Sequence, residues 1–214
     1  MTQAGKAVAL VSALGAVGGG VAVASGAFNQ SEKQQPQQKT EDVITISSKL
    51  ASEGFDTNVT DTEWEALLNA HNAVQDGNIF EATSSEQKDK AWLTKKCRGA
   101  LGKGEEDSAN YLLARQWCVK ETSISTLFGK EGSKHKLLST DERNTETNQS
   151  EWTQKINSLK TNDSEKQKLK VKLDKGDAEN IVEIKKVCAT IVATKTTVKE
   201  FNEKLELAKN WCSA

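Results

Sequence analysis

From Val43 onward, apolar residues recur every three or four positions, with charged and polar residues between them. This spacing is the period of an α-helix that buries one face. Turn and capping residues divide the first half of the chain: Gly54 ends the first helix, Thr60-x-x-Glu63 is a capping box that opens the second, and Gly102 ends the third. The predicted helices cover residues 43–53, 60–77, 84–101 and 107–119.

The second half shows the same order of elements after a connector that contains Gly129 and Gly132. Its apolar residues match those of the first half helix by helix, with Leu137 and Leu138 standing where Leu50 stood. The later helices carry Trp152, Ile156 and Leu159; then Leu169 and Leu173; then Ile181, Ile184, Cys188 and Ile191; and finally Val198, Phe201, Leu205, Ala208 and Cys212 after the Thr197-x-x-Glu200 cap. The pattern predicts an all-α fold.

One phrase occurs twice. Leu113-Ala-Arg-Gln-Trp-Cys118 returns at the end of the chain as Leu207-Ala-Lys-Asn-Trp-Cys212. The distances between the shared Trp and Cys landmarks agree in the two halves to within one helical turn. This agreement is typical of a diverged duplication. We therefore predict two repeated helical units, at residues 43–128 and 137–214, joined by a connector at 129–136.

The N-terminal region has a different composition. Residues 7–28 contain no charged side chain and are rich in Ala and Gly, and Lys6 precedes them. About 20 such residues are long enough to span a bilayer as a helix. Two interpretations compete: an uncleaved transmembrane anchor in residues 1–28, or a cleaved signal peptide with Ala22-x-Ala24 as its cleavage site. A buried helix of a soluble protein is the third alternative. Residues 29–42 are polar and predict a disordered linker. The first two interpretations place the remaining chain outside the cytoplasm, either anchored in the cell membrane as a single-pass protein or secreted.

Each predicted unit contains one Cys in its third helix and one at the end of its fourth. An even number of Cys in a repeated pattern of an exported protein predicts disulfides. Pairing within each unit, Cys97 with Cys118 and Cys188 with Cys212, is the simplest arrangement because a duplication copies the bond. Cys118 lies farther from the turn near Gly104 than Cys97 does, so a longer loop or a steep helix crossing must compensate. Buried free thiols and the other pairings remain alternatives.

No pattern of catalytic or cofactor-binding residues is present. The Cys residues are too widely spaced for the close ligand pairs of a zinc site, so no metal and no cofactor are expected. His71 lies at the edge of an apolar helical face and is expected in the core, whereas His135 lies in a polar connector and is expected to be inert. We therefore expect no enzyme. The 29 Lys and Arg residues balance 30 Asp and Glu residues, so nucleic acid is not an expected partner.

The Ala- and Gly-rich leader, the polar stalk and the Ala114-Arg115-x-Trp117-Cys118 motif resemble a large paralogous family of uncharacterised proteins. These proteins occur in haemotropic mycoplasmas, wall-less bacteria that attach to red cells. The resemblance implies a membrane or surface location and many divergent copies in each genome. It implies no catalytic or binding residue, because the family has no established activity.

These observations predict a membrane-anchored extracytoplasmic helical protein. The expected function is surface display or contact with a host protein, and the alternative is scavenging of a small host-derived ligand bound between the two units. A broad exposed apolar patch would favour the contact function. A pocket between the units, lined by aromatic and a few polar residues, would favour ligand binding.

Overall fold

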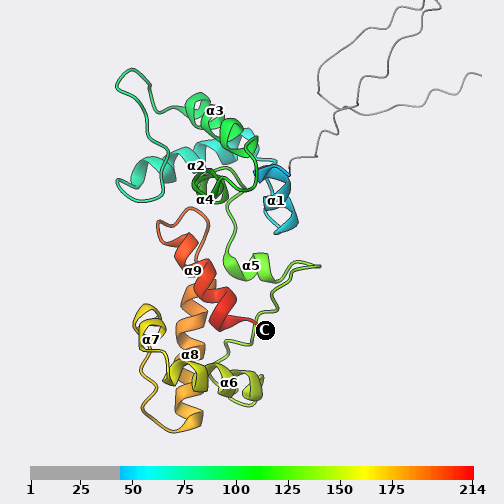
Figure 1. Cartoon of the computed structure of the whole chain (residues 1–214), viewed down its shortest axis with the longest axis vertical. Coiled ribbons are helices and arrows are strands. Elements are labelled where there is room, and N and C mark those ends of the chain that lie inside the picture. The colour runs from blue at the N-terminus through cyan, green and yellow to red at the C-terminus, as the bar shows by residue number, and fades with distance from the viewer. Residues whose placement is uncertain (1–43) are drawn as a thin grey trace, which may run out of the picture. The chain divides into compact units, whose positions relative to one another are not determined.

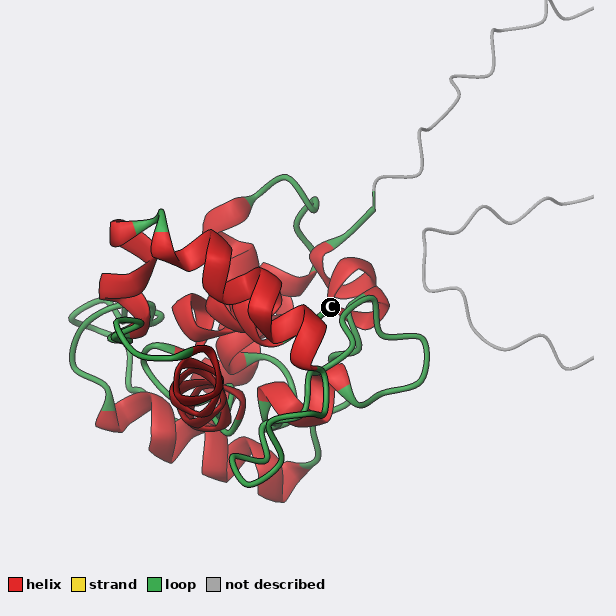
Figure 2. Ribbon diagram, turned by 90° about the horizontal axis from the view of Figure 1, so that it is seen from below, coloured by secondary structure: helices red, strands yellow, loops and turns green. Residues whose placement is uncertain are grey.

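The structure is a computed structural model that describes residues 44–214. The predicted anchor or signal segment at 1–28 and the linker at 29–42 lie outside the described residues and stay predictions. Within residues 44–214 the chain forms helices and isolated β-bridges but no strand, so the all-α prediction is confirmed (Figures 1 and 2). None of the helices in this region is long and apolar enough to cross a bilayer.

The helices follow one another as two groups with a short helix between them (Figure 1). The first group is α1 (Ile46–Ser52), α2 (Asp61–Ala73), α3 (Lys90–Leu101) and α4 (Ser108–Trp117). The short α5 (Ile124–Phe128) follows. The second group is α6 (Gln149–Lys160), α7 (Asp163–Leu169), α8 (Asp177–Val192), α9 (Phe201–Leu207) and a final π-helical turn, η1 (Ala208–Cys212).

Local hydrogen bonds fix where several helices begin. The predicted capping box is present: the Thr60 backbone N–H donates to Oε2 of Glu63 at 2.7 Å, and α2 begins at the next residue. Two other predicted starts were wrong. The third helix begins at Lys90 behind Asp89, whose side chain accepts the Trp92 N–H, and not at Ser84-x-x-Gln87. Thr197-x-x-Glu200 precedes α9 as a turn, and the helix begins at Phe201.

The same set of backbone hydrogen bonds occurs twice, once in each half of the described region. In the first half, the segment that enters α1 is bonded to the α3–α4 loop, and in the second half the segment that enters α5 is bonded to the α8–α9 loop. A further matching bond follows each second Cys by two residues. The three bonds are Ile46 N–H to Lys103 O, Glu105 N–H to Ile44 O and Lys120 N–H to Asp56 O in the first half, and Ile124 N–H to Thr194 O, Thr196 N–H to Thr122 O and Ala214 N–H to Lys136 O in the second.

These bonds correct the sequence alignment of the two halves. The counterpart of α1 is α5, not the segment at Leu137 and Leu138. The predicted boundary after residue 128 assigned α5 to the first unit, whereas its backbone bonds join it to the second. Leu138 is buried, but it lies in a connection where its N–H donates to the Cys212 carbonyl.

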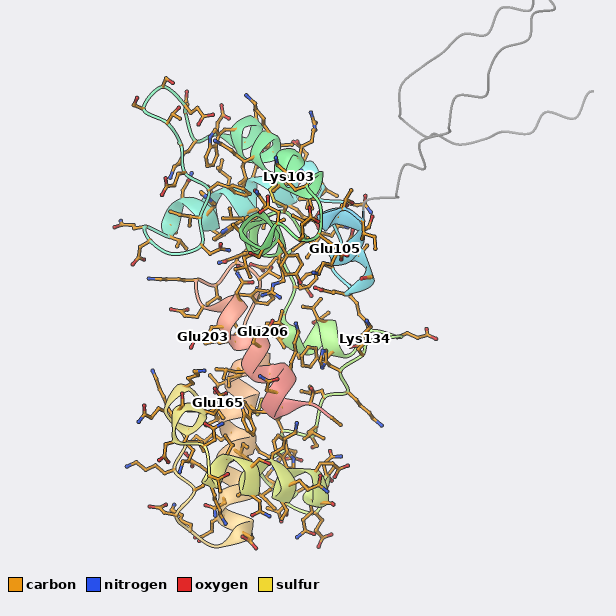
Figure 3. All side chains as sticks on the ribbon, in the orientation of Figure 1. Lys103, Glu105, Lys134, Glu165, Glu203 and Glu206 are labelled. Carbon is orange, nitrogen blue, oxygen red and sulfur yellow. A yellow bond between two sulfur atoms is a disulfide. The ribbon has the colours of Figure 1, made fainter. Side chains whose placement is uncertain are left out.

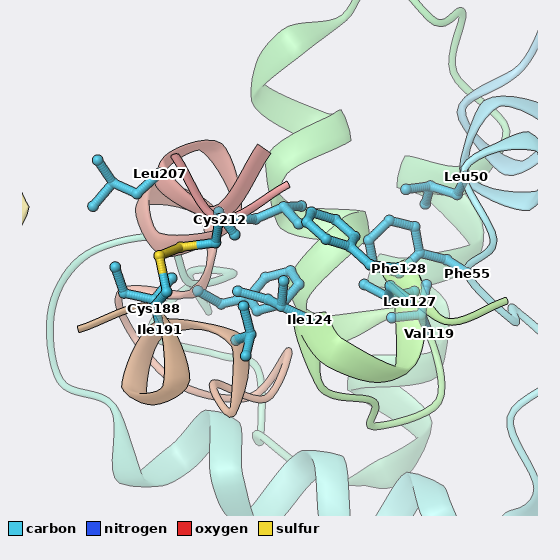
Figure 4. Close-up of a cluster of buried hydrophobic side chains, with 14 of the residues drawn as sticks. Leu50, Phe55, Val119, Ile124, Leu127, Phe128, Cys188, Ile191, Leu207 and Cys212 are labelled. Atoms are coloured by element: carbon cyan, nitrogen blue, oxygen red, sulfur yellow. A yellow bond between two sulfur atoms is a disulfide. The ribbon is translucent and has the colours of Figure 1, made fainter. Parts of the chain in front are cut away.

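Both halves share one core. The described residues 44–214 belong to one compact unit, and its buried apolar residues are a single cluster. In Figure 4, Leu50, Phe55 and Val119 from the first half lie beside Leu127 and Phe128 from α5. The edge-to-face contact of Phe55 with Phe201, with ring centroids 6.3 Å apart, also joins the halves. The predicted units are therefore not separated by a solvent-exposed linker within the described region.

A fully buried lysine orders the longest connection in the second half. Lys185 of α8 is 0% exposed, and its Nζ donates to the carbonyl oxygens of Asp141, Asn144 and Thr147 at 3.3, 2.5 and 3.2 Å. Burial lowers the pKa of Lys185, while Asp141 opposes that shift. The three carbonyls supply the partners that a buried ammonium needs. The connection between α5 and α6 is longer than the one between α1 and α2, and Lys185 holds its additional residues in place.

We predict that Lys185→Met lowers the free energy of unfolding by about 3 kcal/mol, because it leaves three carbonyl groups of the connection without their donor. Urea unfolding followed by Trp fluorescence measures this change. Lys186→Met is the matched control: Lys186 is the exposed neighbour on the same helix, and its replacement should change stability by less than about 0.5 kcal/mol. Equal stabilities of the two variants would contradict the assigned role.

Candidate functional site

The repeated phrase ends in the same covalent bond in both halves. Cys97 is bonded to Cys118 and Cys188 to Cys212, with Cα–Cα distances of 5.3 and 5.5 Å, and all four residues are buried. The within-unit pairing is therefore confirmed. The loop at 102–107, which is bonded to the entry of α1, lies between α3 and α4 and provides the extra length that this pairing requires.

The Trp of each phrase also makes a similar contact, because its indole N–H donates to an earlier segment of the same half. The Trp117 indole N–H donates to the Asn78 carbonyl oxygen at 2.6 Å, and the Trp211 indole N–H donates to Oε2 of Glu165 at 2.8 Å. Asn78 lies in the α2–α3 connection and Glu165 in the corresponding α6–α8 connection. Lys168 and then Trp211 lower the pKa of Glu165 by hydrogen bonding to its carboxylate. Each phrase thus links its disulfide to the segment before the helix that carries the first Cys: the α2–α3 loop in the first half, and α7, which precedes α8, in the second.

The basic residues of the two phrases meet at one carboxylate. The side chain of Arg115 is 4% exposed, its Nε donates to Oδ1 of Asn202 at 2.7 Å, and its Nη1 lies 3.2 Å from Oε1 of Glu206. Lys209 Nζ lies 3.0 Å from the same Glu206 oxygen. Burial acts to raise the pKa of Glu206, but the two cations outweigh it and the pKa is lowered. Arg115 belongs to the first half and Glu206 to the second, so this cluster joins the halves.

Three amide side chains complete the contact between α4 and α9. The Gln116 Oε1 accepts from Nδ2 of Asn78 and of Asn202, at 3.0 and 3.3 Å, and its Nε2 donates to the Val198 carbonyl at 3.0 Å. Gln116 is 0% exposed. A buried amide whose oxygen and nitrogen both have partners favours one arrangement of its neighbours. Gln116 therefore holds the first half against the second, a role that the sequence pattern did not reveal.

A pocket of about 270 Å³ lies at the junction of the two halves. Its lining combines the end of α1, the segment from α5 into the following turn, Leu205 of α9 and Lys209 of η1. The lining includes Glu53, Phe55, Leu127, Phe128, Lys130, Glu131, Lys134, His135, Leu205 and Lys209. Figure 3 shows Lys134 on the turn after α5 and Glu206 on α9.

The pocket lies between two equivalent turns. Glu53-Gly54 follows α1 and Glu131-Gly132 follows α5, and both glycines have a positive φ, of 88° and 78°. A left-handed backbone favours Gly because a Cβ would be strained there. The sequence contains a signal for this match that the alignment by Trp and Cys missed: Ile46-Ser47 and Glu53-Gly54 recur at the same spacing as Ile124-Ser125 and Glu131-Gly132.

Neither histidine is placed as a catalytic base. His71 is 0% exposed and lies among the rings of Phe80, Trp92 and Trp117, and its Nε2 accepts the Phe80 backbone N–H at 3.1 Å. Burial lowers its pKa. His135 was expected to be inert in a solvated connector, but it stacks on Phe128 with ring centroids 5.1 Å apart and lines the pocket. Burial lowers the pKa of His135 as well, which favours the neutral ring.

Within residues 44–214, no group of three His, Cys, Asp or Glu side chains lies close enough together to hold a metal ion. The expected absence of catalytic, metal and cofactor residues stays a prediction for the whole chain. The candidate site is therefore the junction pocket.

We predict that removal of either disulfide, by Cys97→Ala with Cys118→Ala or by Cys188→Ala with Cys212→Ala, lowers the free energy of unfolding by roughly 3 kcal/mol. Because both halves share one core, each double variant should still unfold in a single transition. Denaturant unfolding monitored by Trp fluorescence and by circular dichroism tests both points. Two separate transitions would show that the halves are energetically independent.

We also predict a pH dependence that originates at His71. The pKa of His71 is below the ordinary 6.5 in the folded chain, so the unfolded chain binds more protons near that pH. The free energy of unfolding therefore has its full value above pH 6.5 and decreases as the pH falls below 6.5. In His71→Gln an amide oxygen can accept the Phe80 N–H without titrating, which should flatten the profile between pH 7 and 5. His135→Gln is the control and should retain the dependence that His71 causes. A profile unchanged by His71→Gln would contradict this assignment.

No family model, no curated protein and no solved structure matches the chain, so the pocket has no counterpart with which it can be compared.

Proposed function

We propose that this chain is an extracytoplasmic binding protein that holds a small molecule at the junction of two copies of one helical unit. The single observation that carries the binding function is the pocket between the equivalent Glu-Gly turns, which has aromatic and aliphatic walls and charged groups at its rim. Concave apolar sites with a few polar groups are typical of small-ligand sites.

We infer that the two copies cover residues 44–121 and 122–214. The matching backbone bonds, the two disulfides and the two Trp contacts support this division. It moves the boundary in front of α5, because α5 and α1 begin with the same bonding pattern. The copies differ most in the connection between α5 and α6, which is longer than the one between α1 and α2, and in α7, which lies between α6 and α8 and has no counterpart between α2 and α3.

The extracytoplasmic location is supported by the cysteines. All four described Cys residues are paired, and disulfides persist in oxidising compartments outside the cytoplasm. We propose that residues 7–28 anchor the chain in a bilayer or direct its export, and that residues 44–214 are displayed outside. The resemblance to surface proteins of haemotropic mycoplasmas is retained as part of this proposal.

Contact with a host protein is the other proposed function of a displayed chain, and the described surface supports it less. Within residues 44–214 the large apolar side chains that are exposed are Ile44, Leu112 and Val198, at 54%, 37% and 36%. Such a small number does not form the broad apolar patch that marks many protein-binding surfaces. The binding function is therefore the preferred one.

The location is tested by thiol alkylation of the native membrane fraction. We expect the four Cys to react only after reduction, and we expect protease added to intact cells to digest residues 44–214. Alkylation of all four Cys without reduction, in a chain protected from protease, would overturn the extracytoplasmic assignment.

The binding function is tested by native mass spectrometry of the full-length protein purified from its own membrane. We expect a co-purifying small molecule in the wild type and its loss in Ala51→Trp, because position 51 is exposed at the pocket wall and Trp would fill the space. Ala91→Trp adds the same bulk at an exposed position of α3, outside the pocket, and should retain the molecule. No bound molecule in any form, or equal retention by Ala51→Trp, would contradict the proposal.

A further inference from the structure

The floor of the junction pocket is apolar. Phe55, Leu127, Phe128 and Leu205 line it and are only 5%, 4%, 7% and 2% exposed. They come from the α1 turn, from α5 and from α9, so a ligand on this floor would touch both copies. The volume of about 270 Å³ lies near the lower end of the range for ligand sites. The apolar part of the ligand is therefore short.

The rim of the pocket is positively charged. Lys130, Lys134 and Lys209 line it against Glu53 and Glu131, which leaves an excess of one positive charge when His135 is neutral. Lys130 Nζ donates to the Gly54 carbonyl, which is a neutral group. Among the described residues, neither Lys130 nor Lys134 forms an ion pair, so their charges lack a bound carboxylate.

Two carboxylates near the pocket, Glu53 and Glu206, are already bonded to other groups, whereas the Glu131 carboxylate has no partner among the described residues. Glu53 accepts the hydroxyl proton of Tyr111 in a hydrogen bond. Glu206, beside Lys209, is shared by that lysine and by Arg115, so two cations face one anion at this end of the site. The arrangement therefore has more cationic donors than anionic acceptors, and one further anion would complete it.

We propose that the pocket binds a small organic anion, a carboxylate joined to a short apolar chain. The carboxylate lies at the lysine rim, near Lys130 and Lys209, and the chain lies on the floor formed by Phe55, Phe128 and Leu205. This ligand class rests on the proposed binding function and narrows it. A neutral analogue loses the contacts with the rim, a cationic one meets repulsion there, and acetate lacks the chain that covers the floor.

The test uses the full-length protein in lipid nanodiscs and isothermal titration with four probes: hexanoate, hexanamide, hexylammonium and acetate. Partition into the bilayer is removed by subtracting the titration of Ala51→Trp. We expect hexanoate to bind about tenfold more tightly than hexanamide, and hexylammonium and acetate to give no difference from Ala51→Trp. Lys130→Met and Lys209→Met should each reduce the preference for hexanoate over hexanamide severalfold, whereas the distant Lys186→Met should not.

The outcomes separate this inference from the binding function. If hexanamide or hexylammonium binds as tightly as hexanoate, the anion preference is overturned while binding in the pocket stands. If no probe distinguishes the wild type from Ala51→Trp, the proposed ligand class is overturned, and the binding function then depends on the native mass spectrum alone. A hexanoate preference that survives both lysine variants also overturns the assigned rim.

Discussion

A disulfide joins α3 to the end of α4 in the first half and α8 to the end of η1 in the second, and the rest of the fold is built around this pair of bonds. The helices are short, and several, such as α1, α5 and α9, have too few residues to be stable alone. Each disulfide reduces the number of conformations open to the unfolded chain, and it fixes the position of the Trp next to its second Cys. The indole N–H of that Trp donates to the segment before α3 in the first half and before α8 in the second. The short phrase around Trp and Cys thus organises three segments of its half at once.

The two halves are joined by polar contacts as well as by the shared core. Arg115 and Gln116 occupy the variable positions of the first phrase, and they make the contacts with Asn202, Glu206 and Val198 across the junction. In the second phrase the same positions are Lys209 and Asn210, and Lys209 turns to Glu206 within its own half. The Trp and Cys that both phrases share make contacts within their own half, whereas Arg115 and Gln116 of the first phrase make the contacts between the halves.

The sequence was sufficient for the helical class and for the cysteine pairing, because both follow from local periodicity and from repetition. It was insufficient for α5, because the apolar residues Ile124, Leu127 and Phe128 lie close behind the fourth helix and before a glycine-rich turn. The sequence pattern contained no signal for Lys185, because its burial depends on carbonyl groups about 40 residues earlier in the chain. The pocket depends on how the two copies pack together, which no single-helix pattern encodes. The stacking of His135 on Phe128 was missed for the same reason, because the pattern predicted no helix at residues 124–128.

The buried ammonium of Lys185 has a consequence for the conditions under which the protein remains ordered. Three main-chain oxygens converging on one cation resemble the way in which loops of many extracellular proteins are ordered by calcium. Here the cation is covalently part of the chain, so it cannot be lost by dilution or removed by a chelator. The connection between α5 and α6 keeps its shape whatever the mineral content of the surrounding fluid.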